Sequence, residues 1–173
     1  MNTCPFPAGF FSQTASAVAR GLVGHTVVCN VGATPVSAII LETEAFEDGA
    51  DGGSIRKGML YGPGTVFVMN HRGHLYLNVG TDASGVASCV MVRSVLIGTE
   101  TVEGPGRVSK RLGVTVALDG RMLGTDLDML ANDLARPVVQ QSSTATGAAK
   151  NSAVRFNADS RWVGHVRQIL TSP

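Results

Sequence analysis

The segment IILETEAF, residues 39–46, places two glutamates inside an otherwise apolar stretch. The three apolar residues that open it are typical of a buried strand, and a strand would point Glu42 and Glu44 to the same face because side chains alternate. One interpretation is that these charges lie at a strand edge or end and discourage aggregation. The other is that one carboxylate is held in a cleft as a general base. The eight residues alone leave both interpretations open.

The composition predicts one folded domain. The chain has 173 residues, of which 44% are hydrophobic and 16% are charged, which is enough to bury a core and excludes a disordered chain. The longest apolar run, residues 88–98, contains Arg93 and is too short to span a membrane. The N-terminal residues lack a basic region followed by an apolar one, so no secretion signal is expected. The three cysteines are widely spaced, which favours a reducing compartment and forms no zinc motif.

The charge is close to balanced overall but unevenly distributed along the chain. The net charge is +1, which by itself predicts no polyanionic partner. Residues 52–111 hold seven basic and three acidic side chains, and residues 136–173 hold five basic and one acidic. If the fold brings these two segments together they form a basic patch suited to phosphate groups, whereas the alternative is ordinary scatter of surface charge.

Turn residues divide the chain into short elements. Gly and Pro in GATP (32–35) predict a turn between two strands, and HRG (71–73) predicts a tight hairpin turn. Pro105 near the start and Gly113 just past the end predict a helix between them. The predicted strands are 25–31, 36–46, 64–70, 74–79, 86–98 and 153–164, the last closing the chain, and the predicted helices are 12–22 and 103–114. Residues 126–135 are interpreted as a helical turn or a surface loop, and 141–152 as a flexible loop.

This order of elements predicts the α+β class with a mainly antiparallel sheet. We expect residues 1–173 to form a single domain, with residues 1–11 as a flexible N-terminal extension. Ser12 or Thr14 would cap the first helix.

Seven stretches in the same order resemble the alkyladenine (3-methyladenine) DNA glycosylase family, over roughly residues 14–168. The resemblance implies a compact domain in which short helices flank a curved antiparallel sheet, and a protruding β-hairpin enters the DNA minor groove. The damaged nucleotide is flipped into a pocket, and water cleaves its N-glycosidic bond. The stretches are AVARGLVGHTVV (17–28), LETEAF (41–46), IRKGMLYGPGTVFV (55–68), GHLYLNV (73–79), VMVRSV (90–95), EGPGRVSKRLGVT (103–115) and AVRFNADSRWV (153–163).

The resemblance also implies an enzymatic role and its setting. The chain would be a monofunctional glycosylase of base-excision repair that removes alkylated purines, with deaminated and etheno purines as further candidates. It implies no cofactor and no metal. The partner would be duplex DNA containing a damaged purine. The protein would be a monomer with no membrane association, and it would lie in the cytoplasm of a bacterium or phage host. Two alternatives stay open: a lesion-binding member without hydrolysis, and a domain that binds a small ligand or protein.

The resemblance assigns the catalytic roles to Glu44 and Arg93. Glu44 would activate the attacking water, and Arg93 would help hold that water. An arginine among apolar strand residues needs a partner when buried, and Glu44 or a phosphate would serve. The alternatives are a glutamate that no longer catalyses and an arginine that faces outward. Glu42 is interpreted as structural or as the partner of a basic neighbour.

The base pocket implied by the resemblance consists of Phe46, Met69 and Asn78. Phe46 and Met69 stand at positions of aromatic residues in the family, and Asn78 matches an asparagine that contacts the base. A phenyl ring still stacks on a cationic base, whereas a thioether is softer and less directional. The alternatives are core packing for the first two and a strand-end turn for Asn78. The pocket histidine that the family carries has no counterpart in residues 47–58.

The remaining assignments concern DNA. Arg72 would fill the space left by the flipped nucleotide, with His71 and His74 beside it; the alternative is a solvated hairpin tip. Further basic residues would contact phosphates, and each alone is also consistent with a solvated side chain. They are Arg56, Lys57, Arg107 and Lys110, with Arg111 on the same helix as the last two.

Overall fold

A long central strand, β3 (Val36–Glu47), organises the domain. The computed structural model describes residues 1–47, 57–134, 137, 139–144 and 153–172. The helices are α1 (Ala15–Leu22), α2 (Pro105–Leu112) and α3 (Ser160–Thr171), and the short 3-10 helices are η1 (Phe10–Ser12), η2 (Lys57–Leu60) and η3 (Val116–Leu118). The other strands are β1 (Thr3–Pro5), β2 (Thr26–Cys29), β4 (Val66–His71), β5 (His74–Gly80), β6 (Ser88–Ile97), β7 (Glu100–Glu103), β8 (Leu127–Asn132), β9 (Val139–Thr144) and β10 (Ala153–Ala158).

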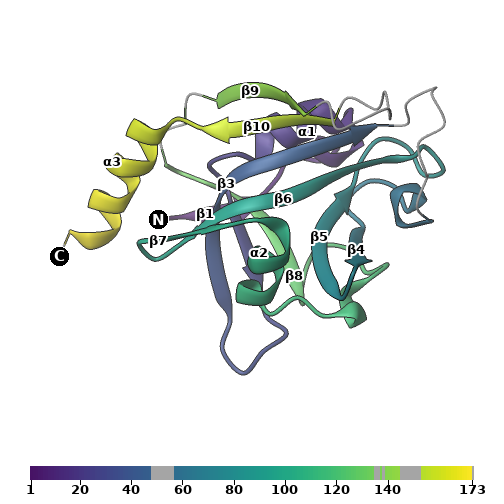
Figure 1. Ribbon diagram of the computed structural model, residues 1–173, viewed down its shortest axis with the longest axis horizontal. Helices are drawn as coiled ribbons and strands as arrows, with labels where there is room; N and C mark the ends of the chain where they lie inside the picture. The colour runs from purple at the N-terminus through teal and green to yellow at the C-terminus, as the bar shows by residue number, and fades with distance from the viewer. Residues whose placement is uncertain (48–56, 135–136, 138, 145–152, 173) are drawn as a thin grey trace.

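The strands form one branched antiparallel sheet around β3 (Figure 1). Its main path runs β1-β8-β2-β3-β6-β5-β4, while β7 pairs with β6, and β10 pairs with both β3 and β9. Along β3, residues 36–39 pair with β2 and residues 42–45 pair with β10, so one edge of the strand serves two neighbours in turn. The other edge pairs with β6 from Ile39 to Glu47. The α+β class and the mainly antiparallel sheet are therefore confirmed.

Helix α1 covers one face of β3 and β6 and closes the main core. Its apolar stripe of Ala15, Val18, Ala19 and Leu22 is buried completely, at the spacing of one helical face. Thr14, one of the two predicted caps, accepts a hydrogen bond from the Ala17 amide at 3.3 Å. Helix α2 begins at Pro105 and ends before Gly113, whose φ of +76° is the left-handed conformation expected there.

Three sequence predictions about element type are wrong. Residues 127–132 form strand β8 between β1 and β2, where a helical turn or a loop was predicted. Leu127 and Met129 are buried while Asp128 between them is half-buried, so the segment alternates as a strand does. Pairing on both sides outweighs the helix propensity of its leucines, methionine and alanine. Partial burial of Asp128 raises the pKa of its carboxyl.

The second correction concerns the C-terminal segment. The strand predicted for 153–164 ends at Ala158, and helix α3 follows. Asp159 caps this helix by accepting hydrogen bonds from the amides of Arg161 and Trp162, at 2.8 and 3.3 Å. Val166 on α3 packs against Ile39, Leu41 and Leu96 in a second, smaller core. Residues 141–144 belong to β9 instead of the predicted loop, and residues 145–152 lie outside the described residues.

The first eleven residues contact the rest of the domain. Strand β1 pairs with β8, and Phe6 stacks on Phe10 with ring centroids 4.1 Å apart. Phe6 also meets the His25 ring edge to face. The flexibility expected of this extension stays a prediction, but the segment carries a strand and an aromatic cluster. None of the described helices is long and apolar enough to cross a bilayer.

Candidate active site

Two β-bulges set which side chains of β3 and β6 face the core. On β3, the residues on the α1 side are Ile40, Thr43 and Ala45, and Thr43 donates a hydrogen bond from Oγ1 to the Ala19 carbonyl at 2.8 Å. The step of three residues marks a break in alternation, and the register with β6 shifts at the same place. Glu42 and Glu44 therefore both lie on the opposite face, as their spacing predicts.

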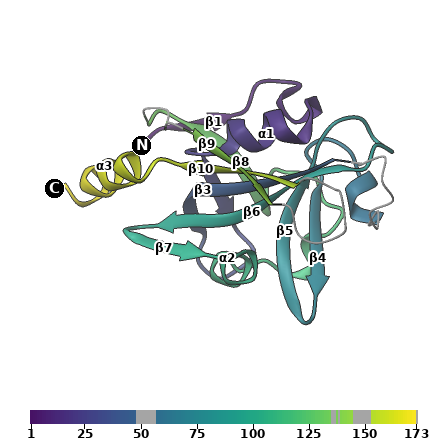
Figure 2. The same cartoon turned by 45° about the horizontal axis from the view of Figure 1, so that its top comes forward.

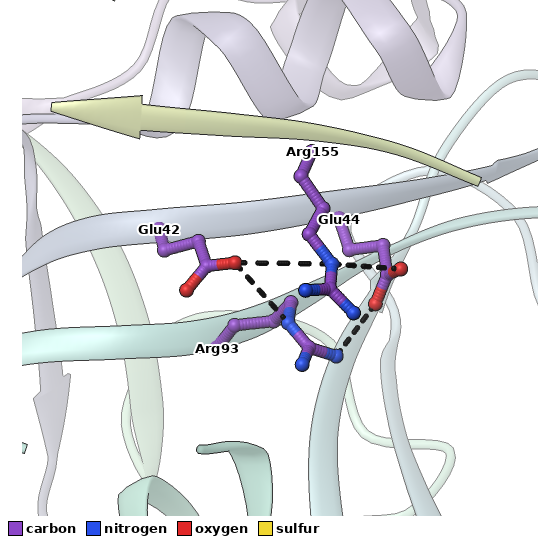
Figure 3. Close-up of polar contacts among 4 residues, drawn as sticks. All are labelled: Glu42, Glu44, Arg93 and Arg155. Atoms are coloured by element: carbon purple, nitrogen blue, oxygen red, sulfur yellow. Dashed lines mark hydrogen bonds and ion pairs between the residues drawn. The ribbon is translucent and has the colours of Figure 1, made fainter. Parts of the chain in front are cut away.

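Strand β6 carries the complementary bulge. Ser94 pairs with Glu42 and Val92 pairs with Thr43, so Arg93 is an extra residue between them. Such an insertion bends the strand and redirects the local side chains. The Arg93 guanidinium lies between the two glutamates (Figure 3).

Four charged side chains meet at this place. Arg93 donates from Nη1 to Oε2 of Glu44 at 2.6 Å, and its Nε lies 3.4 Å from Oε1 of Glu42. Arg155, on β10, donates from Nε to Oε1 of Glu44 at 3.2 Å and lies 3.8 Å from Oε1 of Glu42. Figure 3 shows the two arginines converging on Glu44 from the strands that flank β3. We call these four residues the charge cluster.

The carboxylate of Glu44 in the charge cluster is buried. Glu44 is only 4% exposed, and a buried carboxylate is costly unless it is paired and hydrogen-bonded. Two glutamates and two arginines balance each other's formal charge. The position of Glu44, buried on a central strand, excludes the interpretation of this residue as a charge on an exposed strand. Arg93 has the predicted carboxylate partner, while its side chain keeps 20% of its surface exposed.

A row of directly opposed residues links the charge cluster to the predicted base pocket. Arg155 pairs with Glu44, Glu44 with Met91, and Met91 with Asn78. Directly opposed residues lie on the same face of a sheet, so this row crosses β10, β3, β6 and β5. Asn78 is 1% exposed and donates from Nδ2 to the carbonyls of Tyr76 and Phe67, at 3.0 and 3.2 Å. It is therefore a buried strand residue, and the strand-end turn considered for it is wrong.

Phe46 and Met69 lie on the same face as this row. Phe46 is two residues beyond Glu44 on β3, and it pairs with Cys89. Met69 pairs with Tyr76, which is two residues before Asn78 on β5. Both side chains are partly buried. The three predicted pocket residues thus share one sheet face with Glu44, although only Asn78 lies in its row.

The hairpin β4–β5 carries the predicted wedge at its tip. Arg72 and Gly73 form a two-residue turn with φ of +51° and +81°, the signature of a type I′ turn. Asn70 accepts a hydrogen bond from the Gly73 amide at 3.2 Å. His71 and His74 are the last pair of the hairpin, and both are exposed. Figure 2 shows this hairpin extending away from the centre of the sheet.

The predicted phosphate contacts divide into three groups. Arg107 and Lys110 are exposed on α2, whose Gly106 lies against His74 and Tyr76 of the hairpin. Arg111 on the same helix binds both oxygens of Glu100, at 2.7 and 2.8 Å. Arg56 lies outside the described residues, as does the side chain of Lys57 at the start of η2.

Arg155 and Met91 are the site residues that the sequence analysis did not select. Arg155 is 111 residues from Glu44 in the chain, and only the pairing of β10 with β3 brings the two together. Met91 lies between Glu44 and Asn78 in the row and is 5% exposed. Met91 could have been selected from the sequence, because it lies two residues before Arg93 on the same predicted strand and so on the same face. Among the residues that the structure describes, no three histidine, cysteine or acidic side chains gather as metal ligands.

The fold and the site define a curved antiparallel sheet with a buried, arginine-paired glutamate and an exposed hairpin beside it. The sequence profile of the family described as methylpurine-DNA glycosylase (MPG) matches residues 9–158. A Myxococcus xanthus protein, provisionally assigned as a 3-methyladenine DNA glycosylase, is 37% identical over 134 residues, which are 69% of each chain. A Mesorhizobium japonicum protein with the same provisional assignment is 30% identical over 86% of this chain and 83% of its own. This chain belongs to the methylpurine-DNA glycosylase family and is, by that membership, a DNA glycosylase.

Proposed function

We propose that this protein hydrolyses the N-glycosidic bond of alkylated purines in duplex DNA and uses Glu44 to activate water. The observation that carries the proposal is the burial of Glu44 between two arginines, on the sheet face that also holds Asn78 and Phe46. A carboxylate held in one orientation provides the fixed proton acceptor that a general base needs. The family and the relatives named above support the coarser activity.

The reaction follows from what a carboxylate can do next to a sugar. Glu44 orients a water molecule, takes one of its protons, and directs its oxygen at C1′ of the flipped nucleotide. A C1′–O bond forms while the C1′–N bond breaks, and the bond electrons leave with the purine. Positive charge develops on the sugar ring, and the Glu44 carboxylate stabilises it. Each carboxylate oxygen has two lone pairs, so an oxygen that accepts from an arginine can also accept from water.

The surroundings of Glu44 suit a cationic purine. Purines methylated at N3 or N7 already carry positive charge and depart as neutral bases, so they need little further activation. The Phe46 ring offers a π face on which such a base can stack. The Nδ2 group of Asn78 is engaged with two backbone carbonyls, and these bonds hold its amide in a fixed orientation. We therefore propose 3-methyladenine and 7-methylguanine as the main substrates, with hypoxanthine and ethenoadenine as weaker ones.

The hairpin gives the protein its route to the base. A two-residue tip that carries Arg72 is narrow enough to enter a minor groove, and the guanidinium can fill the space of a flipped nucleotide. Arg107 and Lys110, on the helix that packs against the hairpin, would contact the backbone on either side. The protein would act as a monomer on DNA inside the cell, with no metal and no cofactor.

The test is base release from a labelled duplex that contains one 7-methylguanine, 3-methyladenine or hypoxanthine, with alkali used to cut the abasic product. Glu44→Gln keeps the size of the side chain and removes the base, so single-turnover excision should fall at least about 100-fold. DNA binding should remain within about threefold, because the change lies below the contact surface. Glu103→Gln, an exposed glutamate on β7, is the matched control and should excise as the wild type does.

Two results would count against the proposal. Wild-type protein that binds these duplexes but releases no base would favour the lesion-binding alternative. In that case Met69 and the loop without a histidine would become the suspects. Full activity of Glu44→Gln would instead remove Glu44 from the mechanism.

A further inference from the structure

Arg155 contacts Glu44 from the side opposite Arg93. Strand β10 pairs with β3 so that Arg155 stands directly across from Glu44. Its Nε donates to Oε1 at 3.2 Å, while Arg93 holds Oε2 at 2.6 Å. The two oxygens of one carboxylate are thus held by guanidinium groups from two different strands (Figure 3).

We propose that Arg155 is a positioning residue for the glycosylase reaction, which fixes the plane of the Glu44 carboxylate. The proposal rests on the function proposed above. The last torsion of a glutamate side chain has broad, two-fold preferences, so a carboxylate anchored through one oxygen still rotates. A second anchor on the other oxygen stops that rotation. The directions of the carboxylate lone pairs, and hence the position of a water bound to them, then become fixed.

Arg93 is shared between the two glutamates of the charge cluster. Arg93 faces both glutamates, with Nη1 at Glu44 and Nε 3.4 Å from Glu42, the latter an ion pair without hydrogen-bond geometry. Arg155 adds a second guanidinium, whose Nε donates to Oε1 of Glu44. Arg155 therefore anchors the oxygen of Glu44 opposite the one that Arg93 holds.

A purely structural role makes a different prediction. Strand β10 is held by backbone pairing with β3 and β9. Loss of the side chain alone should therefore leave the strand in place. If Arg155 only supported the fold, a change of side chain would alter stability and DNA binding along with activity. A positioning role predicts a selective loss of the excision rate.

The atom that makes the contact permits a precise test. Because Nε, and not a terminal nitrogen, donates to Glu44, the amide nitrogen of a glutamine can stand in nearly the same place. Arg155→Gln keeps the hydrogen bond and removes the charge, whereas Arg155→Met keeps a similar shape and removes both. Arg161→Met, at an exposed arginine in the first turn of α3, is the matched control.

Single-turnover excision of 7-methylguanine, the affinity for the same duplex and the melting temperature would be measured for each variant beside wild type and Glu44→Gln. We expect Arg155→Met to lose about 10–100-fold in excision rate, Arg155→Gln to stay within about fivefold of wild type, and both to bind DNA within about threefold. Arg161→Met should match wild type in all three.

The outcomes separate the two proposals. If wild type excises and Glu44→Gln does not, but Arg155→Met keeps the wild-type rate, the positioning role is wrong and the proposed function stands. Equal losses in Arg155→Gln and Arg155→Met would also overturn the hydrogen-bond role, as would a loss matched by equally weakened DNA binding. A wild type that releases no base overturns the proposed function, and the role of Arg155 with it.

Discussion

At the scale of single residues, Arg72 adopts a backbone conformation that arginine seldom adopts, at the position from which it would enter the DNA. Its φ of +51° belongs to the left-handed region, where asparagine and glycine are favoured at the first position of a type I′ turn. Apart from the Gly73–Asn70 hydrogen bond at the tip, the Arg72 side chain itself makes no hydrogen bond or ion pair with a described residue. An arginine at this position is therefore easier to explain by an interaction with DNA than by hairpin stability.

Arg72→Asn tests hairpin stability and the interaction with DNA separately. The Asn-Gly turn that it creates fits the backbone, so the free energy of unfolding should rise by about 0.5–1 kcal/mol. Excision from duplex DNA should fall about tenfold, because asparagine is too short to fill the space of a flipped nucleotide. Thermal melting and single-turnover excision give the two numbers. A variant that loses stability, or one that excises as fast as wild type, would contradict the interpretation.

The cysteines differ in accessibility. Cys4 is exposed, while Cys29 and Cys89 are buried, and burial raises the pKa of the Cys89 thiol to about 12. A thiol with that pKa holds almost no thiolate at pH 8, and the thiolate is the reactive form. Cys29 is protected by its burial, so iodoacetamide at pH 8 should modify only Cys4 in the folded protein and all three cysteines after unfolding, as intact-mass spectrometry would show. Rapid labelling of Cys89 in folded protein would mean that β6 opens readily.

At the scale of elements, the end of β5 depends on a glycine that other residues cannot replace. A Cβ at Gly80 would lie 2.1 Å from the Gly62 carbonyl oxygen, and a backbone atom cannot swing aside as a side chain does. We expect Gly80→Ala to destabilise the protein by about 3 kcal/mol or to prevent folding. Excision should also fall at temperatures below melting, because β5 carries Asn78. Gly32→Ala, where the nearest atom is 3.8 Å away, is the control for urea unfolding.

The elements also show what a single sequence can and cannot specify. The hairpins were predictable because their turns contain Gly, Pro and a two-residue loop between alternating strands. Strand β8 was missed because Leu127–Asn132 has helix-forming residues, and only pairing with β1 and β2 makes it a strand. Helix α3 could have been found from Asp159, a common helix cap that the strand-like residues before it obscured.

The residues of the candidate site also divide into those that the sequence could predict and those that it could not. Glu44 and Arg93 could be selected because both carry charge within apolar strands, and the family resemblance gave them roles. Arg155 is also a charged residue in a predicted strand, but none of its neighbours in the sequence indicates that it contacts Glu44. Long-range pairing and the bulges at Leu41 and Arg93 decide which charged groups meet, and no short stretch of sequence contains that information.

At the scale of the whole molecule, DNA binding must come from local charge, because the net charge is only +1. The exposed residues Arg72, Arg107 and Lys110 lie on the hairpin and on the helix whose Gly106 packs against His74 and Tyr76 near the hairpin tip. Arg111 on the same helix is already paired with Glu100, and that pairing holds the pKa of the Glu100 carboxyl below its usual value. The helix therefore offers a matched pair of cations: Lys110 makes no ion pair with a described residue, and Arg111 is engaged with Glu100.

Lys110→Gln and Arg111→Gln test whether this surface contacts DNA. Each phosphate contact releases counterions, so the slope of log affinity against log salt concentration should become shallower by about 0.9 in Lys110→Gln. Arg111→Gln should leave the slope nearly unchanged, since its guanidinium is occupied by Glu100. Fluorescence anisotropy on a damaged duplex between about 50 and 200 mM salt covers the informative range. Equal changes of the slope in both variants would show that the helix acts only through its total charge. An unchanged slope in Lys110→Gln would mean that the DNA backbone does not contact α2 at this residue.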